Sequence, residues 1–291
     1  MRFARSLGPH TGRQARAAPG AVALSLPFAL AAVLSATARA QAPEVEVRAV
    51  SEYAAVRTGG AFRVAVRLAV PAGWHIGWIN PGAGGLPTTI AWHLPAGVTG
   101  GTTDWPFPET DDAGGDVSHV YRGTVTLFST FRADSGASGT LRLAADLSWG
   151  LCQAVCIPQR RSVSVAIPVT RGATPRTPEW TEAEAATRLL PMLERGAAVT
   201  ATREDQGLRL AFTGLKAGPV TGSWVTFFPA EPRRPSVVAP VRRIANGVEI
   251  TLPLAVLGDT SVRVLGVLVG AHRPGAPPPF RAIAVDAAVA R

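Results

Sequence analysis

Reactive side chains are scarce in this 291-residue sequence, which contains only two cysteines, Cys152 and Cys156, and two methionines. Its five histidines show no metal-ligand spacing. No Gly-x-Ser-x-Gly elbow, His-Glu-x-x-His motif or phosphate-binding glycine loop occurs, which argues against the common hydrolases and nucleotide enzymes. The sequence indicates no cofactor. The cysteine pair is therefore the main candidate for chemistry.

The net charge of +9 does not indicate nucleic-acid binding. Residues 1–40 hold five arginines and no acidic residue, so the remainder carries 24 basic and 20 acidic residues, a net charge of +4. Those basic residues form no dense stripe interleaved with aromatic residues, the usual pattern of a phosphate-binding surface. We therefore expect no nucleic-acid partner.

The first 40 residues have the pattern of a secretory signal peptide. An arginine-bearing segment precedes an apolar stretch at residues 21–34, and Ala38-Arg39-Ala40 fits a cleavage site. The apolar stretch is too short for a membrane-spanning helix and contains Pro27. A retained N-terminal anchor is the alternative. We expect a mature protein that starts at Gln41, spans no membrane, and lies in the periplasm or outside a bacterial cell.

Short alternating runs separated by glycine and proline predict an all-β protein. Residues 41–170 are expected to form one immunoglobulin-like β-sandwich, and residues 197–291 a second. Between them, residues 171–196 are expected to form a linker and a short helix. A capping box at residues 181–184 would begin that helix, and Pro191 would kink or shorten it. The predicted strands are residues 44–50, 62–68, 124–128, 141–147, 160–169, 208–212, 223–228, 248–252, 262–269 and 282–289.

In an oxidising compartment, Cys152 and Cys156 are expected to form a small disulfide ring. Closing such a short loop stabilises a fold by only about 2 kcal/mol, against more than about 4 kcal/mol for a loop of a hundred residues. A ring with three intervening residues is expected to be strained, and strain is typical of labile disulfides. Spacing alone leaves a structural bridge and a redox centre equally open.

Residues 73–87 are rich in tryptophan, glycine and proline, and Trp92 and Trp105 follow them. This composition predicts a fixed irregular loop that its tryptophans pack onto the sandwich. A platform for a sugar or an aromatic ligand is the alternative. His75 and His93 lie in this region and are expected to be structural.

Several motifs then resemble a known family. They are WHIGWINPG at residues 74–82, GLPTTIAW at 85–92, WPFPE at 105–109, YRG at 121–123 and SWGLCQAVCIP at 148–158. In this order they are similar to the N-terminal periplasmic domain of the DsbD/ScsB thiol:disulfide interchange family. Residues 180–291 more weakly resemble the module that follows in the ScsB-like branch.

The resemblance implies that Cys152 and Cys156 are a redox pair. The pair would relay electrons from a membrane or thioredoxin-like protein to periplasmic thiol-disulfide proteins, as a carrier and not a complete enzyme. Trp149, Tyr121 and His119 would support the pair or belong to its cap region. Tyr121 is expected to pack beneath the cap, whereas His119 either lies in a surface loop or lowers a thiolate pKa. In the DsbD branch of this family, a cap loop with an aromatic residue shields the cysteines. The corresponding segment here, residues 111–119, has no aromatic residue, which implies an open cap or none.

Two alternatives remain at this point. A reduced Cys152/Cys156 pair could bind Cu(I), which prefers thiolates, and the ScsB-like branch is associated with copper tolerance. Alternatively, the protein is a binding or scaffold protein with a structural disulfide. The sequence does not indicate which cysteine attacks, or the direction of electron flow.

Overall fold

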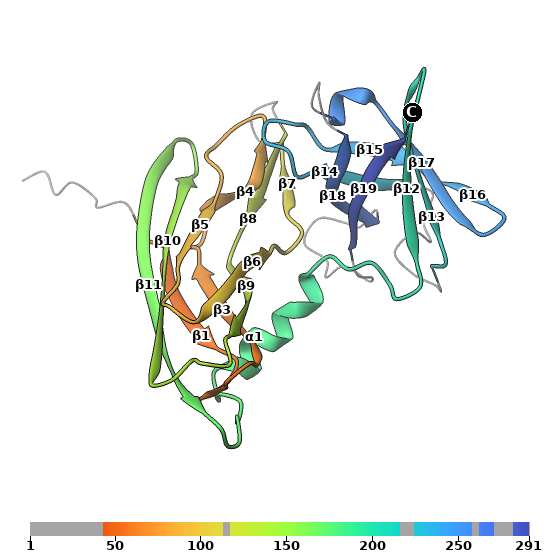
Figure 1. Ribbon diagram of the computed structural model, residues 1–291. Helices are drawn as coiled ribbons and strands as arrows, with labels where there is room; N and C mark the ends of the chain where they lie inside the picture. Colours follow the sequence, from red (N-terminus) through yellow and green to blue (C-terminus); the bar gives the residue numbers. More distant parts are fainter. Residues whose placement is uncertain (1–42, 113–116, 216–223, 258–261, 271–281, 291) are drawn as a thin grey trace, which may run out of the picture. The chain divides into compact units, whose positions relative to one another are not determined.

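The computed structural model describes residues 43–112, 117–215, 224–257, 262–270 and 282–290. The expected signal peptide lies outside these residues. The described chain is all-β with one short α-helix and three sheets, as Figure 1 shows. None of the described helices has the length and apolar character needed to cross a membrane.

The first two sheets are built from residues 46–170. One sheet has the strand order β1 (Glu46–Ser51), β3 (Ala61–Ala69), β9 (Thr124–Ala133) and β6 (Val98–Asp104). The other has the order β2 (Val56–Arg57), β11 (Cys156–Thr170), β10 (Thr140–Cys152), β4 (His75–Gly82), β8 (Ser118–Tyr121) and β7 (Glu109–Asp111), with β5 (Thr89–His93) also paired to β10.

Strand β10 shows why these sheets pack together. Its side chains alternate, so that Leu147, Trp149 and Leu151 are buried while Arg142 and Asp146 are exposed. The buried row packs in one core with Val66 and Leu68 and their neighbours on the four-stranded sheet. Period-two alternation therefore creates one apolar face, and burying it joins the two sheets.

Residues 75–82 differ from the expected irregular loop, because they form strand β4. Strand β4 pairs with β8 through an irregular register between Gly77 and Gly82, and it also pairs with the end of β10. The expected packing of the tryptophans is confirmed, since Trp78 is 1% exposed and Trp74, Trp92 and Trp105 are partly buried against the same core. The glycines thus accommodate an irregular strand rather than a loop.

The helix is shorter than its sequence pattern indicated and begins elsewhere. Helix α1 spans Trp180–Ala186 and continues as a 3₁₀ turn, η1, over Thr187–Leu189, so the chain leaves the helix before Pro191. The capping-box prediction is wrong, because α1 starts at Trp180 without a side-chain cap. Trp180 is fully buried, edge-on to Phe128 at 5.8 Å. Burial of one indole therefore positions this helix more than its capping residues do.

The last third of the chain forms one eight-stranded sheet, whereas two packed sheets were expected. Its strands are β12 (Ala198–Glu204), β13 (Gly207–Thr213), β14 (Trp224–Pro229), β15 (Val237–Pro240), β16 (Arg242–Ile244), β17 (Gly247–Leu252), β18 (Arg263–Gly270) and β19 (Ile283–Ala290), with a 3₁₀ turn, η2 (Leu254–Val256), after β17. Parallel pairing of β12 with β19 joins two antiparallel groups of four strands into the order β15-β14-β18-β19-β12-β13-β17-β16. This sheet contributes its own core, which includes Leu210, Phe212 and Phe227.

Candidate functional site: a disulfide at a hairpin tip

The disulfide lies at the tip of the long β10–β11 hairpin, the green hairpin of Figure 1. Cys152 and Cys156 are directly opposed residues, and their Cα atoms are 4.0 Å apart. Only Gln153, Ala154 and Val155 separate them, and the Gln153 amide donates to the Val155 carbonyl across the turn. The hairpin has thirteen register pairs, and the two cysteines form the last of them. The disulfide is therefore carried by the most extended strand pairing of the described residues.

The two cysteines differ in their access to solvent. Cys152 is 2% exposed, whereas Cys156 is an exposed residue next to Val155, which is 68% exposed. The Cys152 Sγ also lies 3.6 Å from the carbonyl oxygen of Gly150, which is an acceptor for the thiol of the reduced state. An incoming thiolate can thus reach Cys156 directly, while Cys152 is shielded.

The shield over Cys152 is the loop that contains Leu86. On strand β10 the side chains of odd-numbered residues enter the core, so Gly150 and Cys152 face the opposite surface of the sheet. A methyl group at Gly150 would lie 3.1 Å from the Leu86 Cβ and 3.4 Å from the Cys152 Sγ. Leu86 and Cys152 therefore lie side by side over Gly150.

Gly77 on the neighbouring strand allows the same close approach. A methyl group there would lie 2.4 Å from the Leu86 carbonyl oxygen, and both the amide and the hydroxyl of Thr88 donate to the Gly77 carbonyl, at 3.2 and 2.6 Å. Two glycines on adjacent strands thus let the loop lie directly against the sheet. In this position the loop covers the buried cysteine.

A row of side chains runs across the sheet from the disulfide. Cys156 is opposite Cys152, and Cys152 is opposite His75 on β4. The next strand, β8, pairs Tyr121 with Ile76, so the following residue, Arg122, continues the row beside His75. Directly opposed side chains in antiparallel strands lie on the same face, about 5 Å apart. The imidazole of His75 therefore lies next to the buried cysteine.

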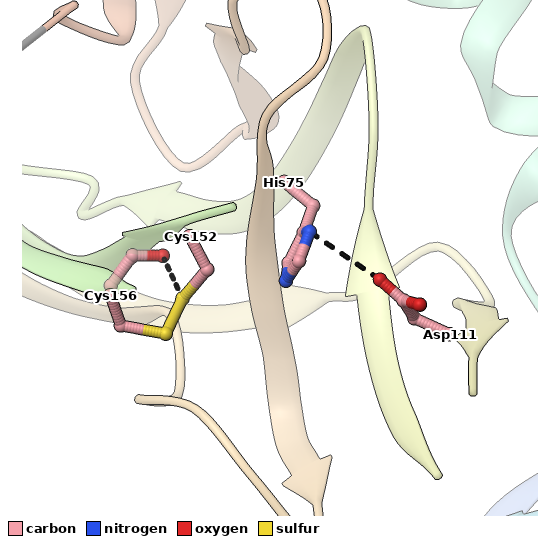
Figure 2. The surroundings of a disulfide bond; sticks show 5 residues. His75, Asp111, Cys152 and Cys156 are labelled. Carbon is pink, nitrogen blue, oxygen red and sulfur yellow. Dashed lines mark hydrogen bonds and ion pairs between the residues drawn. A yellow bond between two sulfur atoms is a disulfide. The ribbon is translucent and has the colours of Figure 1, made fainter. Parts of the chain in front are cut away.

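Asp111, on the edge strand β7, holds this histidine from the other side. Its Oδ2 lies 3.5 Å from the Nδ1 of His75 and accepts a 2.5 Å hydrogen bond from Arg122. Figure 2 shows the imidazole between the disulfide and Asp111. Burial lowers the pKa of His75 below its ordinary value of 6.5; Asp111 opposes this shift and Arg122 adds to it. The imidazole is consequently neutral at pH 7 and can accept a proton.

Residues 41–167 match the family model described as thiol:disulfide interchange protein DsbD, N-terminal. These residues form a DsbD N-terminal domain. A search of the curated proteins finds no match.

Among solved structures, the chain resembles the N-terminal periplasmic domain of ScsB from Proteus mirabilis. The two are 17% identical with a TM-score of 0.56, and the alignment covers 85% of this chain and 94% of that one. The major pilin SpaD from Corynebacterium diphtheriae is 10% identical over 83% of this chain and 61% of its own, with a TM-score of 0.29. At this level of identity, the likeness to ScsB indicates a shared fold.

Trp149 and Tyr121, which the family resemblance placed near the redox pair, support the DsbD domain from its core. Both lie on the inner face of the sheet, opposite to Cys152. Trp149 donates to Gln159 across the hairpin at 3.2 Å, and the hydroxyl of Tyr121 donates to the Pro106 carbonyl at 2.6 Å. Burial raises the pKa of Tyr121 well above its ordinary value, so its phenol stays neutral.

His119 does not lie in a surface loop, as its position in the family's cap segment suggested. It belongs to strand β8, is fully buried, and donates from Nδ1 to the Asn80 carbonyl at 2.8 Å. Its side chain faces the core side, because its neighbour Val120 is the residue opposite Gly77. His119 is therefore on the opposite face of the sheet from Cys152, and it is His75 that the fold brings to the disulfide.

The cap segment, residues 111–119, is only partly described. Asp111 ends β7 and Ser118 begins β8, while residues 113–116 lie outside the described part of the chain. Within that part, no group of three or more His, Cys, Asp or Glu residues could hold a metal ion. Both sulfurs are engaged in the disulfide, so a Cu(I) site at this pair applies only to the reduced protein.

Sequence reasoning missed three residues of this site, namely His75, Asp111 and Leu86. His75 and Asp111 are 77 and 41 residues from Cys152 in sequence, and only the strand order brings them together. A signal for Leu86 was present, since Gly77 and Gly150 both lack a side chain on the face that Cys152 shares. Two glycines on the outer face of adjacent strands indicate that another segment lies against them.

Proposed function

We propose that this protein exchanges thiols and disulfides through Cys152 and Cys156, carrying two electrons at a time between protein partners. The observation that carries the proposal is the disulfide's asymmetry, with one buried and one exposed cysteine, at a hairpin tip of a DsbD N-terminal domain. A purely structural bridge gains nothing from an exposed cysteine. A ring of this size also stabilises the fold by only about 2 kcal/mol.

The asymmetry assigns a role to each cysteine. A donor thiolate attacks the exposed Cys156 Sγ in line with the disulfide, which forms a mixed disulfide and releases Cys152 as the leaving thiolate. A second donor thiolate then resolves the mixed disulfide and leaves the pair reduced. In the next half-cycle, the Cys156 thiolate attacks the acceptor disulfide, and Cys152 closes the ring again. Cys156 thus contacts the partners, and Cys152 is the internal resolving thiol.

The partners we propose are a membrane or thioredoxin-like electron donor and periplasmic thiol-disulfide proteins as acceptors. The ScsB structure that this chain resembles is a periplasmic domain, and residues 1–40 have the pattern of a signal peptide. Both support a periplasmic location. The exposed Val155 beside Cys156 offers an apolar contact at the point of attack. No cofactor is needed, because the cysteine sulfurs themselves take up two electrons when the Cys152–Cys156 bond breaks and release them when it forms again.

We also propose that the chain is divided functionally near residues 171–196. Residues 41–170 would be an immunoglobulin-like redox domain, and residues 197–291 a separate β-domain that contains no cysteine. One core cluster lies wholly within the first two sheets and another wholly within the eight-stranded sheet, which supports this division, while a third cluster packs Phe228 and Val267 against Trp78 and joins the two parts. The second domain would then serve in partner recognition rather than in exchange.

The test is an equilibrium titration of the mature protein in glutathione redox buffers, combined with trapping by single-cysteine variants. We expect a reduction potential between about −120 and −270 mV, the range of exchange proteins. C152S should form a stable mixed disulfide with glutathione through Cys156, whereas C156S should react slowly, because Cys152 is covered by Leu86. A potential below about −300 mV, or equal reactivity of both variants, contradicts the proposal.

A further inference from the structure

The row of side chains beside the disulfide contains a group that the exchange reaction needs. Cys152 reacts from a covered position, and a thiolate with 2% exposure is poorly solvated. Each time the pair is reduced, this sulfur must gain a proton, and each time it closes the ring it must lose one. The described segments around it offer few groups for such a transfer. The Leu86 loop, residues 82–88, contains no titratable side chain.

Resting on the function proposed above, we propose that His75 is the acid–base residue for Cys152, with Asp111 as the residue that positions it. His75 is directly opposite Cys152 in the β4–β10 register, so their side chains share one face. Its Nδ1 faces Asp111 at 3.5 Å, which leaves Nε2 for the sulfur side, as in Figure 2. The imidazole is neither fully exposed nor sealed in the core, with 18% side-chain exposure.

The chemistry balances when His75 works in the step that closes the ring. The Cys152 thiol gives its proton to Nε2 of His75, and the resulting thiolate attacks the Cys156 Sγ of the mixed disulfide. The Cys152–Cys156 bond forms and the bond from Cys156 to the acceptor sulfur breaks. The acceptor leaves as a thiolate that takes a proton, so the acceptor gains two electrons and this protein loses two. In the opposite direction, protonated His75 returns the proton to the departing Cys152.

The charged groups around His75 suit this role. Asp111 of β7 stabilises the imidazolium that forms, while Arg122, after β8, is paired with Asp111 and with Glu109 and limits that stabilisation. Cys152 and Cys156 face the imidazole from β10 and β11. Burial favours the neutral imidazole, which is the form that accepts the thiol proton. A base that is neutral at pH 7 yet can gain a proton is what the closing step requires.

Ring closure can be measured directly with the aromatic disulfide 5,5′-dithiobis(2-nitrobenzoate). The reduced mature protein releases one thionitrobenzoate when Cys156 attacks the reagent and a second when Cys152 closes the ring, so stopped-flow absorbance separates the two steps. At pH 6.5, H75Q should slow the second release by about 100-fold or more and leave the first unchanged. The difference in rate between H75Q and the wild type should shrink as the pH rises, because a growing fraction of the Cys152 thiol then ionises without help.

Two further variants separate proton transfer from a structural effect. H93Q is the matched control, because His93 also pairs with an aspartate, Asp146, on the same sheet but lies opposite Ala144, far along β10 from the cysteines. It should behave like the wild type. D111N keeps His75 but removes the carboxylate that raises its pKa, so the pH profile of the second release should move to lower pH.

The outcomes distinguish the two proposals. If the wild-type protein shows no second release, or if its disulfide resists reduction in the native state, exchange through the pair fails, and the role of His75 fails with it. If the wild type shows both releases and H75Q follows it from pH 5.5 to 9, exchange stands and only the role of His75 is overturned. An unchanged D111N profile would likewise overturn the positioning role of Asp111.

Discussion

Substitution of Gly77 by alanine tests whether the Leu86 loop covers Cys152 as the structure shows. The added methyl group would lie 2.4 Å from the Leu86 carbonyl oxygen and 3.2 Å from its carbonyl carbon. These are backbone atoms, so no side-chain rotation relieves the clash. Either strand β4 deforms around the methyl group, or the loop lifts off the sheet.

The cost of lifting the loop can be worked out from its contacts. Lifting breaks the two hydrogen bonds from Thr88 to the Gly77 carbonyl, each worth about 1 kcal/mol. Leu86 is already 42% exposed, so its lost burial adds about 1 kcal/mol. This sum of about 3 kcal/mol is an upper limit, because accommodating the methyl group by strain costs about 1–3 kcal/mol. We expect G77A to lower the free energy of unfolding by about 1–3 kcal/mol.

Urea unfolding of the oxidised protein measures this loss, with G136A as the control. A methyl group at Gly136 would have no atom within 4 Å, so that variant should unfold within about 0.5 kcal/mol of the wild type. G77A should also be reduced faster by dithiothreitol, since water can then solvate the departing Cys152 thiolate. If G77A unfolds at the same urea concentration as G136A, the loop does not lie against β4 and Cys152 is not covered by it.

Three other substitutions test separate parts of the structure. L86A should cost about 1 kcal/mol of stability and speed reduction by dithiothreitol about threefold; an unchanged reduction rate would show that Leu86 does not shield Cys152. W180A should lower the free energy of unfolding by about 3–5 kcal/mol in urea, because the indole is fully buried, and a loss below about 1 kcal/mol would contradict its anchoring role. Burial lowers the pKa of His119, so the unfolded chain binds more protons and wild-type stability falls as the pH drops below 6.5, by at most about 1.4 kcal/mol per pH unit. H119F should flatten this slope between pH 7 and 5 in urea titrations, and an equally steep slope would assign the acid sensitivity to other groups.

The strands were predictable wherever one face of the sheet is polar. Alternation across residues 141–147 and 160–169 identified β10 and β11, and the hairpin that they form could be inferred with them. Strand β4 was not predictable in this way, because its outer face is covered by the Leu86 loop and its residues are therefore buried on both sides. A strand buried on both faces loses the period-two signal. Its glycines and Pro81 then resemble a turn.

The same limit applies to the candidate site. The cysteine pair is local in sequence, so its spacing and its flanking motif were sufficient to predict a disulfide and its family. His75 is neighbour to Cys152 only because β4 inserts between β10 and β8, a pairing with no local sequence pattern. From the sequence, His119 was chosen instead because it lies in a segment that resembles the cap. Side chains alternate between the two faces along β8, however, and this places the His119 side chain in the core. Strand order and register therefore decide which histidine lies beside the Cys152 sulfur. A one-residue shift of β4 against β10 would place Ile76 or Trp74 opposite Cys152 instead of His75.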